Sequence, residues 1–112
     1  MTIFAKILAG EIPADVVHED EHCIVFRDIN PVAPQHLLVI PRNPLVSVAD
    51  ATEDDAALLG HLMLVAARFA EQAGFVEDGY RLVTNIGQHG GQSVFHLHIH
   101  LLGGRQMLWP PG

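Results

Sequence analysis

The chain has little of what secreted and membrane proteins depend on. Cys23 is the only cysteine in 112 residues, so no intrachain disulfide can form and a disulfide-stapled secreted scaffold is excluded. No apolar run is long enough to span a bilayer, and the stretch MTIFAKILAGEIP reaches Glu11 and Pro13 before the apolar core of a signal peptide could develop. We therefore expect a soluble, cytoplasmic protein that makes no membrane contact.

Basic residues are also scarce. Six Lys and Arg stand against 13 Asp and Glu, which gives a net charge of -7. That balance repels phosphate backbones and argues against nucleic acid as a partner, although a small anion can still bind locally. The hydrophobic fraction of 49% suffices for one compact core without repeats or linkers. We expect a single domain over residues 1–112, with part of its apolar surface covered by a second copy in a homodimer.

Turn residues and apolar patterns divide the chain into short elements. Thr2 can cap a small helix that begins at Ile3, and a longer helix is expected between Thr52 and Gly74, because Thr52 and Asp55 form a capping-box pattern and Gly74 can end the helix. Segments rich in β-branched and aromatic residues predict strands at 15–20, 22–28, 36–41, 80–85 and 94–102. Residues 103–112 read as an irregular tail. This order predicts an α+β fold, an antiparallel meander with helices packed on one side.

Residues 96–102 read HLHIHLL, three histidines separated by single apolar residues. Alternate side chains of a strand face the same way. We therefore expect His96, His98 and His100 to form a row on the cleft side of the last strand, while the intervening residues Leu97, Ile99 and Leu101 face the core.

Three interpretations of this row remain open. It can be a solvated strand face, or a metal site that recruits an outside ligand such as His36 or Asp28, because neighbouring row members lie roughly 7 Å apart at Cα. It can also be a nucleophilic site in which the central imidazole attacks. The surroundings favour nucleophilic catalysis, because the upstream residues Gly90, Gly91 and Ser93 offer backbone N–H groups and a hydroxyl to an anion.

HLHIHLL resembles the motif of the histidine triad (HIT) family, alternating His with apolar residues and ending in an apolar pair. The resemblance extends over nearly the whole chain, and it is closest to the Hint branch of purine nucleoside phosphoramidases through TIFAKI, APQHLLVIP, LLGHLM, GYRLVTN, GGQSVFH and LLGGRQMLWPPG. It implies a five-stranded antiparallel sheet with two helices, and a homodimer that joins two such sheets into ten strands.

The same resemblance implies a function. A Hint-like enzyme hydrolyses the P–N bond of purine nucleoside phosphoramidates, and also aminoacyl-adenylates, to a nucleoside monophosphate and an amine through a covalent nucleotidyl-histidine. His98 would be the nucleophile, Ser93 would deliver a proton to the amine, and His36 would orient His98. His96 and His100 would flank the phosphate. No cofactor and no metal ion are implied.

Further residues are expected to bind the substrate by resemblance. Asp28 would accept hydrogen bonds from the ribose hydroxyls, and Trp109 would reach the leaving-group region of the other subunit. The purine slot would consist of Ile3, Phe4, Ile7, Phe26 and Ile29. Residues near the phosphate would be Asn85, Gly91, Gln92, Ser93, His98 and His100.

Two alternative functions stay open, a purine nucleotide-binding regulatory module with incidental turnover and a dinucleoside polyphosphate hydrolase. The remaining histidines share no spacing. We expect them to face solvent or lie in loops without a functional role; they are His18, His22, His61 and His89.

Overall fold

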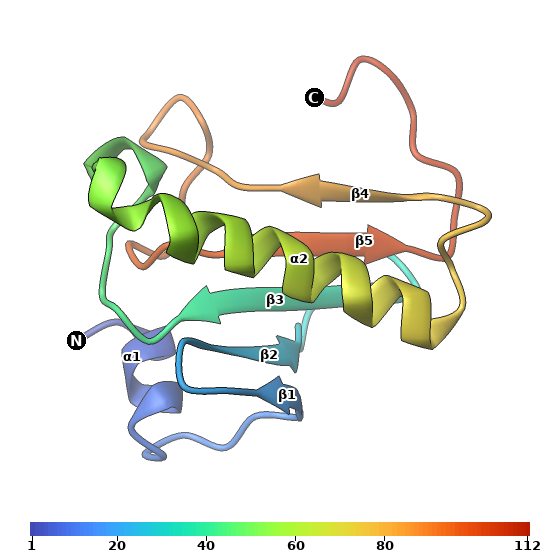
Figure 1. Cartoon of the computed structure of the whole chain (residues 1–112). Coiled ribbons are helices and arrows are strands. Elements are labelled where there is room, and N and C mark those ends of the chain that lie inside the picture. The colour runs from blue at the N-terminus through green and yellow to red at the C-terminus, as the bar shows by residue number, and fades with distance from the viewer.

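A computed structural model describes all 112 residues. Five antiparallel strands form one sheet in the order β1-β2-β3-β5-β4, shown in Figure 1 with β1 and β4 at its edges. The strands are β1 (Val16–Glu19), β2 (Cys23–Arg27), β3 (Gln35–Pro41), β4 (Tyr80–Val83) and β5 (Ile99–Gly103). The helices are α1 (Ile3–Leu8) and α2 (Ala56–Ala73), with short 3-10 turns at Val48–Asp50 and Glu53–Asp55. The structure therefore confirms the α+β class and the count of five strands and two helices.

The connection through α2 decides the strand order. Strands β1, β2 and β3 follow one another as the expected meander. Helix α2 then crosses the sheet, since its 18 residues extend about 27 Å, and it delivers the chain to the far edge as β4 (Figure 1). The last strand, β5, fills the gap between β3 and β4. The meander is thus confined to the first three strands, and the C-terminal strand becomes central.

The two helices lie on opposite faces of the sheet, so the expectation that both pack on one side was wrong. Helix α2 buries its apolar side chains against one cluster, which includes Val25, Leu37 and Leu101. Helix α1 places Phe4 against the alternate residues Phe26 and Leu38. The physical reason is visible in the central strands, where consecutive residues of β2 and β3 are buried instead of every second one, a pattern typical of strands covered on both faces.

The caps at both ends of the α2 region are those that the sequence predicts. The side chain of Thr52 accepts from a backbone N–H of the turn before α2, and the Asp55 side chain accepts from the backbone N–H of Thr52, which completes the capping box. Gly74 ends α2 with φ of 84°.

The last strand is shorter than expected, because residues 94–98 are irregular and regular pairing begins only at Ile99. Neither helix combines the length and apolarity that crossing a bilayer requires.

One glycine lies inside α2 and another at its end, and replacing each with alanine is expected to change the free energy of unfolding in opposite directions. Gly60 lies within the helix, and the space that a Cβ would occupy there is open, so Gly60→Ala should raise the free energy of unfolding by about 0.5–1 kcal/mol. Gly74 occupies the left-handed region, so Gly74→Ala should lower it by roughly 1–2 kcal/mol. Urea unfolding of both variants beside the parent measures this difference, and changes of the same sign would contradict the helix bounds.

Candidate active site

The candidate site lies on the face of the sheet that carries α1, where β3 and β5 pair. His36 pairs with Leu102 and Leu38 pairs with His100, so the two histidines lie on one face of neighbouring strands. His36 Nε2 is 2.9 Å from His100 Nδ1, although the two residues are 64 positions apart in the chain. Strand pairing therefore places the predicted fourth histidine against the triad.

His98 has one nitrogen anchored and one free. Its Nδ1 lies 2.8 Å from the backbone oxygen of His96, and because a carbonyl oxygen can only accept, Nδ1 carries the hydrogen. In the neutral ring Nε2 therefore keeps its lone pair. The ring is almost fully buried and is held edge-on by Phe4 of α1, with ring centroids 4.9 Å apart and an interplanar angle of 83°. The packing thus selects one tautomer and one orientation.

His36 and His100 form a directional hydrogen-bond chain. The backbone N–H of Val32 donates to His36 Nδ1 at 3.1 Å, so the hydrogen of the neutral His36 ring is on Nε2. The Nε2–H of His36 donates to His100 Nδ1. The carboxylate of Asp28 lies 3.3 Å from the same His36 Nε2. The hydrogen of His100 is then on its Nε2. The site therefore sets a lone pair on His98 beside an N–H donor on His100, with ring centroids 5.0 Å apart.

All three of these imidazoles are held neutral. Burial lowers the pKa of His98. The hydrogen bond to the His96 carbonyl raises this pKa, whereas the charge of a protonated His96 ring would lower it, and the net shift is downward. Burial lowers the pKa of His36 against the opposing charge of Asp28. Burial, followed by repulsion from His98 and His36, lowers the pKa of His100 to about 4. A neutral His98 is the form that can act as a nucleophile near pH 7.

His96 and Gln92 form hydrogen bonds that hold the backbone around the site. His96 is buried, with Nε2 2.8 Å from the backbone oxygen of Pro41, and its carbonyl anchors His98. The Gln92 side chain donates to the backbone oxygen of Val46 at 2.7 Å and accepts from the N–H of Gly87 at 3.0 Å. These contacts fix the loop that leads into the histidines. The His96 ring thus bonds the backbone, and the expectation that it flanks the phosphate stays a prediction.

An apolar cavity of about 450 Å³ opens in front of His98. It contains nine of the predicted binding residues, Ile3, Phe4, Ile7, Phe26, Asp28, Ile29, Ser93, His98 and His100. Sequence reasoning missed further lining residues, chiefly Ile12, Pro13, Ala14, Asn30, Val32, Leu38 and Val94. Most follow α1 or β2 in loops, where no periodic pattern marks a side chain as facing a cavity.

A second cavity of about 490 Å³ shares Val32, His36 and His100 with the first. It is lined by strand residues together with Asn85, Arg81 and Arg105, and by tail residues Met107, Leu108, Pro110 and Pro111. Arg81 donates to the backbone oxygen of Leu108 at 2.9 Å, which holds the tail against the chain's own sheet. His36 and His100 therefore stand between an apolar cavity and a more polar one.

Of the other predicted site residues, only Asn85 lines one of the two cavities. Asn85 lines the second cavity and donates to the backbone oxygen of Gly90 at 2.7 Å. Gly91 has φ of 77° in the same loop and contributes to neither cavity. Trp109 is 82% exposed and contacts neither cavity within the chain. Sequence reasoning missed Arg81 and Arg105, for which the only signal was that cations are rare in this chain.

Asp28, His36 and His100 also bring their ligand atoms within 4.8 Å of one another. That spacing alone would admit a metal ion. The hydrogen-bond chain already uses the same atoms, however, since Nδ1 of each ring accepts and His36 Nε2 donates. An ion here would have to displace the bonds that orient His100, so we assign the cluster to hydrogen bonding.

Comparison with known proteins identifies this constellation. A family model described as the HIT domain matches residues 9–107, which include the three in-phase histidines, His36 and Asp28. The chain belongs to the HIT family. Among HIT proteins it is 57% identical over 111 residues to an uncharacterised HIT-like protein of Synechococcus elongatus, a match that covers 99% of this chain and 96% of the relative.

Solved HIT structures share the fold. A HIT family hydrolase from Legionella pneumophila is 51% identical, with a TM-score of 0.97 over 100% of both chains. A histidine triad nucleotide-binding protein from Candida albicans is 28% identical, with a TM-score of 0.82 over 98% of this chain and 83% of that one. This HIT domain therefore has the fold of HIT family hydrolases and nucleotide-binding proteins.

The lowered pKa of His100 makes the stability of the HIT domain depend on pH. The unfolded chain binds a proton at His100 below its ordinary pKa of 6.5, whereas the folded protein binds it only near pH 4. Stability contributed by the neutral ring is therefore complete above pH 6.5 and is lost as the pH falls toward 4. We expect His100→Gln to make the decline in the free energy of unfolding shallower over this window than in the parent.

Urea titrations at several pH values between 7 and 4 measure these two slopes. His98, His36 and Asp28 face the ring and remain in both proteins, so subtracting the slopes removes most of their effect. Parallel slopes would show that His100 is not held neutral by the fold.

Proposed function

We propose that this chain is a nucleoside phosphoramidase that hydrolyses the P–N bond of purine nucleoside phosphoramidates, and also aminoacyl-adenylates. The observation that carries the proposal is the state of His98, whose Nδ1–H is anchored on the His96 carbonyl. The anchor leaves the Nε2 lone pair free on a ring that lines the apolar cavity together with His100. An anchored, neutral imidazole in the apolar cavity, beside the His100 that lines both cavities, suits in-line attack on phosphorus between a nucleoside and an amine.

In the first step Nε2 of His98 attacks phosphorus and the P–N bond to the amine breaks. The His96 carbonyl stabilises the positive charge that develops on the ring, because its hydrogen bond to Nδ1–H strengthens as the ring becomes cationic. The His100 N–H donates to a nonbridging phosphate oxygen. The Ser93 hydroxyl, which lines the same cavity, delivers the proton that the departing amine needs.

In the second step water attacks phosphorus, the bond to His98 Nε2 breaks, and a proton of the water returns to the Ser93 oxygen. The nucleoside monophosphate leaves, and His98 regains the neutral tautomer that its anchor selects. No step uses a cofactor or a metal ion. His36 acts through His100 instead of touching phosphate, since its Nε2–H fixes which nitrogen of His100 donates.

The apolar cavity is proposed to bind the purine nucleoside. Phe4, Phe26 and Ile29 supply apolar surface for the base. The Asp28 carboxylate, which accepts from the backbone N–H of Asn30 at 2.9 Å, keeps lone pairs for the ribose hydroxyls. The second cavity, with Asn85 and the two arginines, is then left for the amine side of the substrate.

A homodimer with a continuous ten-stranded sheet is part of the proposal. Strand β4 is an edge strand, and its free backbone groups can pair with the β4 strand of a second copy. Leu108 and Trp109 are 75% and 82% exposed, which leaves both available to the partner's leaving-group region. A cytoplasmic location, for which the single buried thiol of Cys23 is suited, stays a prediction.

His98→Ala is expected to abolish turnover of an adenosine phosphoramidate while leaving AMP affinity within about threefold of the parent. The variant removes the nucleophile but keeps the cavity that binds the nucleoside. Mass spectrometry of quenched reactions should show an adenylylated parent chain and no adduct on the variant. His89→Ala is the matched control, because it removes an exposed loop histidine.

Three results would contradict the assignment. An adduct on His98→Ala would place the nucleophile elsewhere, and tight AMP binding without turnover by the parent would favour a regulatory module. Faster hydrolysis of diadenosine polyphosphates than of phosphoramidates would favour the polyphosphate hydrolase. The assays should follow chelation, after which activity is expected to persist.

The tail is expected to select the amine. Truncation after Gln106 keeps Arg105, whose guanidinium donates to the backbone oxygen of Val32, but removes the tail residues of the second cavity and Trp109. We expect the truncation to change the ratio of kcat/KM between substrates with small and bulky amines by more than about tenfold. The affinity for AMP should change little. Trp109→Ala separates the indole from the rest of the tail.

Equal changes for amines of every size, together with weakened AMP binding, would contradict this role. Sedimentation at micromolar concentration tests the dimer independently, since a monomeric parent would leave Trp109 without a partner site.

A further inference from the structure

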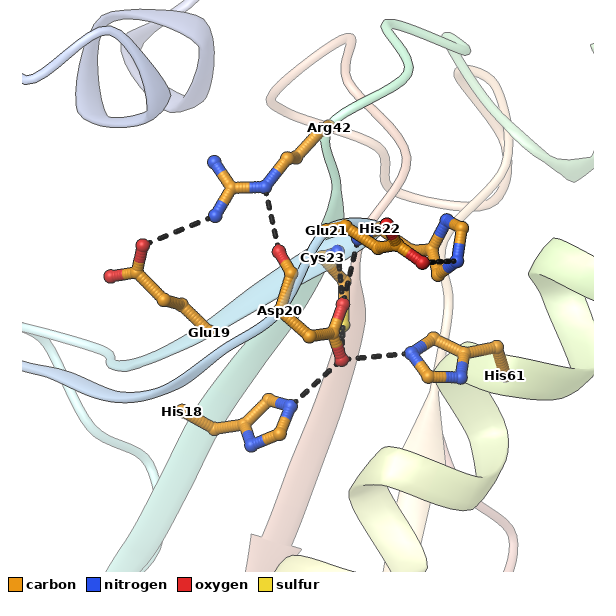
Figure 2. A network of polar contacts seen from close by, with 8 residues as sticks. All are labelled: His18, Glu19, Asp20, Glu21, His22, Cys23, Arg42 and His61. Carbon is orange, nitrogen blue, oxygen red and sulfur yellow. Dashed lines mark hydrogen bonds and ion pairs between the residues drawn. The ribbon is translucent and has the colours of Figure 1, made fainter.

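Arg81 and Arg105 differ from the other three arginines of the chain because neither has an acidic partner. The chain has 13 Asp and Glu residues, yet none of their carboxylates forms an ion pair with either guanidinium. The other arginines form the pairs Arg27 with Asp15, Arg68 with Glu71, and Arg42 with Glu19, of which the last is drawn in Figure 2. The charges of Arg81 and Arg105 are therefore not neutralised within the chain.

The two unpaired arginines line the second cavity of the site, and they supply its only charges. Its other polar side chains are His36, His100 and Asn85, and both rings are neutral because burial lowers their pKa values. The remaining walls are apolar. Asp78 lines a separate cavity of about 250 Å³ with both arginines but forms an ion pair with neither. The second cavity is therefore positively charged in a chain whose net charge is -7.

Strand pairing places Arg81 on the same face of the sheet as His36 and His100. Arg81 pairs with Leu102 of β5, and Leu102 pairs with His36 of β3. Because directly opposed residues share a face, these three residues form one row across the sheet. His100 lies two residues before Leu102, which makes it the diagonal neighbour of Arg81, at roughly 7–8 Å. The sheet therefore sets a cation one step away from the N–H donor of His100.

Both arginine side chains are held by backbone oxygens and keep donors for a ligand. Arg81 donates to the backbone oxygen of Leu108 at 2.9 Å. Arg105 donates to those of Val32 and Gln106 at 3.0 and 3.2 Å, and Val32 lines both cavities. A guanidinium has five N–H donors, so most donors on each side chain remain unused. The acceptors are neutral carbonyls, which leave the positive charge in place.

We propose that the second cavity binds a carboxylate on the leaving amine, so that the preferred substrates are nucleoside phosphoramidates of amino acids, joined to phosphorus through the α-nitrogen. This preference rests on the proposed function, which places phosphorus beside His98 and His100. The α-carboxylate is separated from the nitrogen by one carbon atom, which matches the short distance between His100 and Arg81. Arginine binds a carboxylate through two parallel N–H donors.

The chemistry of the cavity favours such a ligand over other amines. Its apolar walls, which include Met107 and Leu108, are left for the side chain of the amino acid. A leaving amine with a second ammonium group would meet two cations and no carboxylate, so it is disfavoured. A neutral amine would leave both guanidiniums without an anionic partner.

Two substrates that differ by one charge test the site. The adenosine phosphoramidates of alanine and of alaninamide have nearly the same size, but only the alanine compound carries a carboxylate. We expect the parent to show a kcat/KM at least about tenfold higher for the alanine compound. The difference should lie mainly in KM, because the carboxylate is remote from the bond that breaks. Equal kcat/KM values for the two compounds would overturn the proposal.

Glutamine variants locate the cause of this preference. Arg81→Gln and Arg105→Gln should each lower the ratio of the two kcat/KM values by more than about threefold, and the double variant should abolish the preference. The glutamine amide can still donate to the backbone oxygens that hold each arginine. Arg68→Gln is the matched control, because it removes the same charge from the outer surface of α2. An equal loss in Arg68→Gln, or a full preference in the double variant, would contradict the site.

Binding without turnover separates the carboxylate site from the proposed function. Calorimetric titration of His98→Ala, which lacks the proposed nucleophile, compares the dissociation constants of the same two compounds. Binding of the alanine compound at least about fivefold more tightly would support the site even if the parent hydrolysed neither compound. Hydrolysis of both compounds by the parent at equal rates, with equal affinities in His98→Ala, would sink the carboxylate site and leave the phosphoramidase function standing.

The salt concentration supplies a further readout. Arg105 is exposed and Arg81 is half-buried, so added salt screens their attraction for a carboxylate. The preference of the parent for the alanine compound should therefore fall as sodium chloride is added, whereas the ratio for the double variant should stay constant. A preference of the parent that salt does not change would show that it does not arise from these charges, and would overturn the proposal.

Discussion

The pairing of β3 with β5 is the constraint on which the candidate site depends. It sets His36 and His100 on one face of adjacent strands, and only this register brings His36 Nε2 to 2.9 Å from His100 Nδ1. A slip by one residue would turn His36 toward α2, because side chains alternate across a sheet. Burial of Leu37, Val39 and Leu101 under α2 opposes such a slip. The core on one face thereby fixes the chemistry on the other.

Backbone groups complete what the register begins. Val32 supplies an N–H to His36, His96 supplies a carbonyl to His98, and Pro41 supplies a carbonyl to His96. Each contact settles which ring nitrogen carries the hydrogen, since a backbone N–H only donates and a carbonyl only accepts. The tautomers of three histidines are therefore consequences of chain geometry. Neutral rings remain because burial lowers the pKa values of His36, His98 and His100.

The sequence predicted those parts of the fold that rest on local patterns. Alternation in HLHIHLL identified the face shared by His98 and His100, and Thr52 and Gly74 marked the ends of the α2 region. The buried anchoring of His96 was not predicted, because its partner is a carbonyl 55 residues away. His18 Nε2 and His61 Nε2 each lie 2.9 Å from Asp20 Oδ2, and these contacts also depended on nonlocal features, a bulge in β1 and the packing of α2. The spacing of residues within a motif does not predict such contacts.

Electrostatics distinguishes the two cavities beside the triad. The chain carries a net charge of -7, yet a nucleotide brings further negative charge to the site. The apolar cavity is also lined by the Asp28 carboxylate and by Arg27, whose guanidinium is paired with Asp15 at 3.3 Å. In the proposed reaction the phosphate oxygens would be bound there by the dipoles of neutral groups, the His100 N–H and the Ser93 hydroxyl. Arg81 and Arg105 line only the second cavity of the two. Their positive field favours an anionic phosphate next to that cavity and disfavours a leaving group that is already cationic.

An amine that departs neutral, after receiving one proton from Ser93 as proposed, suits this charge distribution better than a permanently charged amine. In the proposed reaction Arg81 and Arg105 would therefore act on the leaving group, and the nucleoside would be held by shape and hydrogen bonds.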